Sequence, residues 1–148
     1  MASKIPESLV FEVTVDWDKS TGGEATIANF PKLKMDLSSD FGGLERYYSP
    51  DDLFLAALGG CLLNTFNFLR KKMRFELIDF RISLQMYVKL GRSKFRVTRI
   101  EGKVDITVPI GEKKKGETCF ELTEEYCHLC NFIKKTVPVE LTVKVKEA

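Results

Sequence analysis

Hydrophobic and polar residues alternate with a period of two along much of this chain, and one long apolar stretch interrupts the alternation. Such alternation is typical of strands that bury one face. The predicted strands are residues 9–15, 24–30, 32–37, 78–90, 95–109 and 137–145. Residues rich in Gly, Ser, Asp and Lys separate them and predict a turn at 16–23 and loops at 38–49 and 112–116.

The apolar stretch predicts one long helix over residues 50–73. Ser49 and Asp52 have the spacing of a capping box, and Pro50 suits the first helical position. The stretch ends in three basic residues, which favour a helix C-terminus. Its 24 residues would extend about 36 Å. Because the middle of this helix is apolar on every side, we expect it to be buried all round.

A second helix is predicted within residues 118–135, where apolar residues recur every three to four positions, at least over the second half. The order is then β-β-β, long helix, β-β, helix, β, which favours an α+β fold in one domain covering residues 1–148. One small sheet cannot cover every side of a 36 Å helix. The simplest cover is a second copy of the chain, so we expect an intertwined homodimer.

The composition is that of an ordinary globular protein, with 148 residues, 44% hydrophobic and 30% charged. It excludes a disordered chain, a collagen-like fibre and a disulfide-dense mini-protein. Residues 1–60 carry a net charge of −5 and residues 61–148 one of +7, with the basic excess densest at 89–115. Basic residues there alternate with apolar ones, which favours the solvated face of a sheet over a nucleic-acid surface. No nucleic-acid partner is expected.

The chain is expected to be cytoplasmic. Residues 1–10 lack the apolar core and small-residue cleavage site of a secretory signal. The longest strongly apolar run, residues 53–63, is too short to cross a bilayer, so no membrane partner is expected. In the cytoplasm thiols stay reduced, and the four cysteines would be packing residues, catalytic thiols or metal ligands.

Cys61 lies at the centre of the long helix, directly after Gly59 and Gly60. Each glycine inside a helix costs about 1 kcal/mol relative to alanine. Such a pair indicates close approach by a backbone, a side chain or a ligand, here beside a thiol. The alternative is that Cys61 is a small residue of the core, as free cysteines often are.

A second candidate is the Cys127-x-x-Cys130 motif, which contains His128, the single histidine of the chain. It could be a redox pair, two thiols that pack a helix, or half of a zinc site. A structural zinc site needs four ligands, and no second close pair exists, so neither a metal nor a cofactor is expected. The motif lies late in the chain and inside a predicted helix, unlike the thioredoxin arrangement. Cys119 stands alone.

Two segments resemble motifs of the OsmC/Ohr superfamily, the osmotically inducible and organic hydroperoxide resistance proteins. Residues 49–62, SPDDLFLAALGGCL, resemble the family's Pro-acidic start of an apolar helix that leads to a cysteine. Residues 126–139, YCHLCNFIKKTVPV, resemble its second cysteine motif before a Val-rich last strand. The predicted element order matches as well, so the resemblance covers essentially the whole chain.

The resemblance implies a homodimeric, thiol-dependent peroxidase that acts on hydroperoxides, preferentially organic ones in some members of the family, and is reduced by an external dithiol. Cys61 matches the peroxidatic cysteine and Cys127 the resolving cysteine, while Cys130 has no counterpart. In the family, an Arg from the N-terminal loops, held by a Glu at the start of the central helix, activates the thiolate. Asp51 stands at the Glu position.

Residues 1–45 contain no Arg, so the thiolate's cation is an open question. The candidates are Lys19, Lys32, Lys34 and Arg46. Asp51 precedes Cys61 by ten residues, about 15 Å along an unbroken helix. The two would then cooperate across a dimer interface or not at all.

Two other functions stay open. One is an OsmC-like protein without efficient peroxidase activity, which binds a small apolar ligand at the dimer interface around Phe54, Leu58 and Phe66. The missing Arg favours this alternative. The other is a local dithiol switch formed by Cys127 and Cys130.

Overall fold

The computed structural model describes residues 5–148 and divides them into two compact units, one reaching to Leu53 and the other spanning Phe54–Ala148. The elements form an α+β fold in the predicted order, with an additional short 3₁₀ helix and a third α-helix. Each unit has its own sheet of three strands.

The N-terminal unit is an antiparallel meander of β1 (Thr14–Trp17), β2 (Gly22–Thr26) and β3 (Leu33–Asp36), followed by the 3₁₀ turn η1 (Ser39–Phe41). The prediction of a strand over residues 9–15 is largely wrong, since residues 9–13 belong to no strand. A strand needs a partner, and β2 pairs only with residues 14–17 on that side. Local alternation does not reveal where the partner ends.

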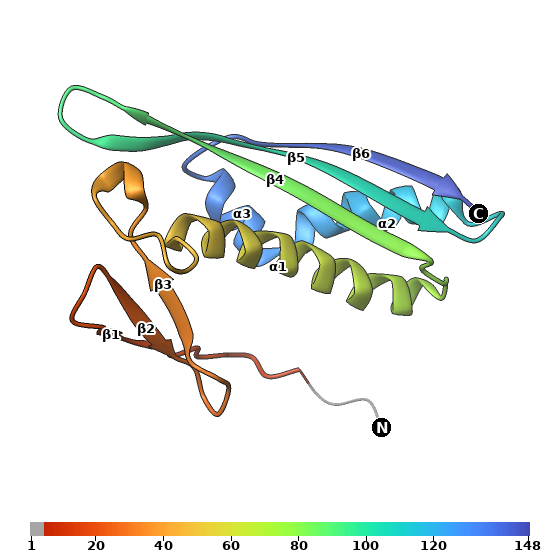
Figure 1. Ribbon diagram of the computed structural model, residues 1–148. Coiled ribbons are helices and arrows are strands. Elements are labelled where there is room, and N and C mark those ends of the chain that lie inside the picture. The colour runs from red at the N-terminus through yellow and green to blue at the C-terminus, as the bar shows by residue number, and fades with distance from the viewer. Residues whose placement is uncertain (1–4) are drawn as a thin grey trace. The chain divides into compact units, whose positions relative to one another are not determined.

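The C-terminal unit is a sheet in the order β4 (Asp79–Leu90), β5 (Phe95–Val108) and β6 (Val139–Glu147), with β4–β5 antiparallel and β5–β6 parallel. The helices α1 (Pro50–Met73), α2 (Lys113–Tyr126) and α3 (His128–Lys134) lie along one face of it (Figure 1).

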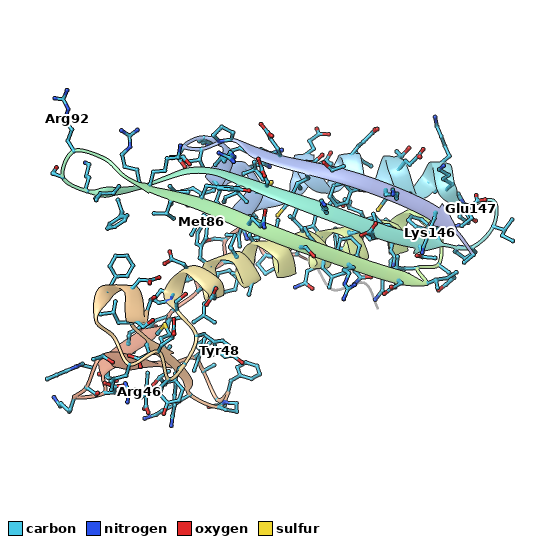
Figure 2. All side chains as sticks on the ribbon, turned by 45° about the horizontal axis from the view of Figure 1, so that its top comes forward. Arg46, Tyr48, Met86, Arg92, Lys146 and Glu147 are labelled. Carbon is cyan, nitrogen blue, oxygen red and sulfur yellow. The ribbon has the colours of Figure 1, made fainter. Side chains whose placement is uncertain are left out.

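Basic side chains of β5 and of the β4–β5 hairpin are mostly exposed, as predicted. Figure 2 shows Arg92 at the hairpin tip, directed away from the sheet.

Helix α1 has the predicted bounds and the predicted capping box. The backbone N–H of Asp52 donates to the Ser49 hydroxyl at 3.2 Å, and that hydroxyl donates to the Asp52 carboxylate at 2.9 Å. Helix α1 is long and apolar enough to cross a membrane, judged by length and composition alone. The core helix of a soluble protein also meets this criterion. Within the chain only one stripe is buried, at Leu58, Gly59, Leu62 and Phe66, so burial on every side is not reached here.

Helix α2 begins within the segment predicted as a loop at residues 112–116. A residue far along the sequence stabilises its start. Glu147 of β6 accepts hydrogen bonds from the backbone N–H groups of Gly111 at 3.0 Å and Lys113 at 3.2 Å. A carboxylate suits the positive end of a helix. The predicted helix over 118–135 is correct in type but divided in two at Cys127, whose backbone is extended.

Two clusters of buried side chains join the helices to the sheet. One contains Phe66, Phe120 and Cys119 packed on the C-terminal half of β5. The other contains Leu58, Leu62, Ile100, Cys127, Cys130 and Ile133, with Cys61 packed against it. Three of the four cysteines therefore belong to one cluster.

Candidate functional site

Cys61 lines a cavity of about 960 Å³ beside α1, and none of the fully buried residues of α1 lines it. Cys61 is half-buried, whereas its neighbour Leu62 is fully buried against the sheet. The lining residues are Ala57, Gly60, Cys61, Asn64, Thr65, Phe68, Leu69 and Lys72 of α1, Leu122 and Tyr126 of α2, and His128. A small, largely apolar molecule could therefore reach Cys61.

Cys127 is placed by the break between α2 and α3. Its N–H donates to the Thr123 carbonyl at 2.9 Å, the last bond of α2, and its carbonyl accepts from the Asn131 N–H at 3.0 Å, the first of α3. The Asn131 side chain donates to the Glu125 carbonyl at 2.6 Å and so satisfies the end of α2. The junction turns the fully buried Cys127 side chain toward α1.

The two predicted functional cysteines meet across α1 and the junction. The Cys127 thiol donates to Cys61 Sγ, and the two sulfur atoms are 3.3 Å apart, both as free thiols. Burial, opposed by the backbone N–H of Cys130 and aided by the hydrogen bond with Cys61, raises the pKa of Cys127 to about 11. Cys127 is therefore held as a protonated thiol beside the more accessible Cys61.

The other two cysteines differ in position. Cys130 is fully buried in the cluster that holds Cys127, and burial raises its pKa. Cys119 belongs to the other cluster, where its thiol donates to the Phe66 carbonyl at 3.7 Å and burial raises its pKa to about 11. Cys119 is thus separate from the thiol cluster.

Asp51 lies in the first turn of α1. The helix continues without a break through Gly59 and Gly60, so about 15 Å of helix separates Asp51 from Cys61. Asp51 therefore does not contact the Cys61 thiol within this helix, which agrees with the separation expected from their spacing.

The close approach predicted at the two glycines is absent within the described chain. A Cβ at Gly59 would lie 3.5 Å from Ile82 and Leu84, an ordinary contact distance, and a Cβ at Gly60 would meet no atom within 4 Å. Gly60 instead lines the Cys61 cavity.

The cations considered from the sequence have partners inside the N-terminal unit. Arg46, labelled in Figure 2, contacts Asp18 and Asp36 at 2.7 Å each. Its guanidinium, with hydrogen bonds from Thr21 and two backbone N–H groups, holds the pKa of Asp36 well below its usual range. The remaining candidates also have partners: Lys32 pairs with Glu24, Lys19 lies over Trp17, and Lys34 lies over Tyr47.

Sequence reasoning missed two basic residues of the cavity, Lys72 and His128. The signal for Lys72 is helical spacing, since positions 61, 65, 68 and 72 share one side of α1. No local signal marks His128, because it depends on how α3 meets α1.

The expectation that Leu58 and Phe66 surround a ligand is wrong for this cavity. Both are buried in the core, and neither lines the cavity. Phe54 is 41% exposed but is absent from the cavity lining.

Across residues 5–148, no group of three or more His, Cys, Asp or Glu side chains is arranged to hold a metal ion. The chemistry that this geometry offers is thiol chemistry.

Comparison with known proteins gives one family match. The model of the family described as OsmC-like protein matches residues 41–142. Among curated proteins, none matches the sequence.

Solved structures share the fold at low sequence identity. An OsmC-like protein from Mycoplasma pneumoniae superposes with a TM-score of 0.81 at 13% identity, covering 93% of this chain and 97% of that one. An organic hydroperoxide resistance protein from Elizabethkingia anophelis, with thiocyanate bound, superposes with a TM-score of 0.76 at 17% identity, covering 95% of this chain and 100% of that one. An organic hydroperoxide resistance protein OsmC from Legionella pneumophila superposes with a TM-score of 0.73 at 18% identity, covering 92% of this chain and 97% of that one.

Proposed function

Since this chain belongs to the OsmC-like protein family of the OsmC/Ohr superfamily, we propose that it is a thiol-dependent peroxidase that reduces organic hydroperoxides. Cys61 is the peroxidatic thiol and Cys127 the resolving thiol. The observation that carries the proposal is the 3.3 Å separation of the two sulfur atoms, with Cys61 lining an accessible, largely apolar cavity.

The reaction follows from thiol chemistry. The Cys61 thiolate attacks the distal oxygen of the hydroperoxide, the O–O bond breaks, and the alkoxide leaves and takes up a proton as the alcohol. Cys61 is now a sulfenic acid, and the Cys127 thiol displaces water from it to form a disulfide. An external dithiol then reduces this disulfide by thiol–disulfide exchange and is itself oxidised.

Apolar side chains around the cavity favour an organic substrate over hydrogen peroxide, because Phe68, Leu69 and Leu122 can contact an alkyl or aryl group. Lys72 and His128 are the basic side chains on the cavity wall and are candidates to stabilise negative charge there. Asp51 remains a candidate catalytic residue only from a second copy of the chain.

A homodimer is part of the proposal. It is supported by the exposed apolar side chains of Phe54, Phe68 and Tyr126, which are 41%, 48% and 62% exposed in the single chain. A cytoplasmic location is also part of it, because the cycle needs Cys61 to be returned to the reduced state.

The test is consumption of cumene hydroperoxide with a dithiol as reductant. The wild-type protein and Cys119→Ser, a change of a buried cysteine outside the thiol cluster, are expected to consume it. Cys61→Ser is expected to lose all activity, and Cys127→Ser is expected to turn over more slowly, because the external dithiol must then reduce the Cys61 sulfenic acid directly. Activity that survives in Cys61→Ser would refute the assignment.

A second candidate is a binding protein for a small apolar ligand. The size of the cavity and the ion pairs that occupy Arg46 and Lys32 favour it. Peptide mapping after one equivalent of hydroperoxide separates the two: a Cys61–Cys127 disulfide supports the peroxidase, and unchanged thiols support binding alone.

A further inference from the structure

A third thiol lies beside the two that the proposed peroxidase uses. Cys127 is the N-cap residue directly before α3, and Cys130 is the third residue of that helix. The Asn131 N–H donates to the Cys127 carbonyl at 3.0 Å, which closes the first helical turn. In this geometry residues three apart have Cα atoms about 5 Å apart. That distance lies within the range that a disulfide requires.

The three cysteines Cys61, Cys127 and Cys130 meet at one packed cluster. Cys127 and Cys130 are both fully buried in it, and Cys61 packs against it from α1. The sequence placed the Cys127-x-x-Cys130 motif inside a helix, which argued against a redox pair. In the structure the motif instead begins a helix, and the extended backbone of Cys127 lets its side chain turn toward Cys61 while Cys130 stays one turn away.

We propose that Cys130 is a second resolving thiol, which takes over the disulfide from Cys61; this inference rests on the proposed peroxidase function. The Cys130 thiolate attacks Cys127 Sγ in the Cys61–Cys127 disulfide. A Cys127–Cys130 bond forms, the Cys61–Cys127 bond breaks, and Cys61 leaves as a thiolate that receives the proton lost by Cys130. No net oxidation occurs in this exchange, and an external dithiol later reduces the Cys127–Cys130 disulfide.

The surroundings of the three sulfurs favour this direction. Cys61 faces the water-accessible cavity, where a departing thiolate can be solvated, whereas the other two thiols are buried. The better-stabilised thiolate is the better leaving group in thiol–disulfide exchange. Burial raises the pKa of Cys130, so few molecules carry the attacking thiolate at neutral pH and the exchange should accelerate as the pH rises.

The exchange has a measurable consequence for stoichiometry. Once the disulfide has moved to Cys127 and Cys130, Cys61 is a free thiol again and can react with another hydroperoxide before any reductant arrives. Without reductant, each chain should therefore consume about two equivalents of hydroperoxide instead of about one.

The experiment mixes reduced protein with a small excess of cumene hydroperoxide, without dithiol, and measures the hydroperoxide left together with the disulfides present. Samples are quenched in acid, alkylated and mapped by mass spectrometry after cleavage at basic and acidic residues, which separates Cys119 from the motif. Wild type and Cys119→Ser should consume about two equivalents, with the Cys61–Cys127 linkage appearing first and the Cys127–Cys130 linkage replacing it. Cys130→Ser should consume about one and keep the Cys61–Cys127 linkage.

The possible failures are distinct. If wild type consumes one equivalent and retains only the Cys61–Cys127 linkage, the transfer to Cys130 is refuted and the proposed peroxidase stands. If wild type consumes none and forms no disulfide, the proposed function itself fails. Should Cys130→Ser not fold, the wild-type stoichiometry and the order of its two linkages still decide the question.

Discussion

Replacing Gly59 by alanine should stabilise the protein, although the glycine lies in the buried stripe of α1. The added methyl group would contact Ile82 and Leu84 at 3.5 Å, an ordinary van der Waals distance. Alanine is favoured over glycine inside a helix by about 0.8–1.0 kcal/mol. Burying one methyl group contributes at most about 0.8 kcal/mol more. The free energy of unfolding should therefore rise by about 1–2 kcal/mol.

Gly116 of α2 is the matched control, because it is also helical and buried but has less space. A Cβ there would lie 3.0 Å from one methyl carbon of Val145 and 3.3 Å from one of Val108. Overpacking of this kind costs about 1–3 kcal/mol, which equals or exceeds the gain in helix propensity. Gly116→Ala should therefore leave the free energy of unfolding unchanged or lower it by up to about 2 kcal/mol.

Urea unfolding followed by circular dichroism, at one fixed protein concentration, measures both changes, since the stability of an oligomer depends on concentration. In a thermal scan each kcal/mol corresponds to about 2–4 °C in a domain of this size. A loss of stability in Gly59→Ala, or a larger gain in Gly116→Ala than in Gly59→Ala, would show that the packing argument is wrong.

Three further predictions concern the core, the acid stability and the thiols. Phe66→Ala, at a fully buried ring, should lower the free energy of unfolding by about 3–5 kcal/mol in the same urea assay, and a cost below 1 kcal/mol would contradict its place in the core. Because Arg46 lowers the pKa of Asp36, the ionised Asp36 stabilises the fold above its unfolded pKa, and this contribution is lost as the pH falls toward its lower folded pKa. Arg46→Met should therefore move acid unfolding, followed by circular dichroism, to higher pH, and an unchanged midpoint would refute the link. Iodoacetamide should label the half-buried Cys61 well before Cys127, whose pKa of about 11 and full burial protect it, and equal labelling in the native protein would contradict this geometry.

Much of the fold follows from local patterns. The bounds of α1 are correct because the capping box of Ser49 and Asp52 and the basic last turn are contained in the segment itself. The bounds of the paired strands β4 and β5 are nearly correct. Exposed and partly buried residues alternate along most of β4, as expected when one face is covered, whereas β5 ends in three successive buried residues. Cys61 and Cys127 are identified as functional candidates by a family resemblance, which rests on the residue types of two motifs and on their order along the chain.

The start of α2 depends on a residue far along the chain. Glu147 of the last strand accepts the N–H groups at the first turn, so residues 112–116 carry no local sign of a helix start. The short β1 is a similar case, because its length is set by the residues of β2 available for pairing.

Periodicity, capping and residue type are local properties of the chain, and they suffice to establish the α+β order, the long central helix and thiols as the available chemistry. The packing of the folded chain is needed to establish that Cys127 lies 3.3 Å from Cys61, that Cys130 joins them in one cluster, and that Cys119 does not. These distances depend on how α1 and the junction of α2 and α3 pack on the same face of a sheet, and sequence separation carries no information about that packing.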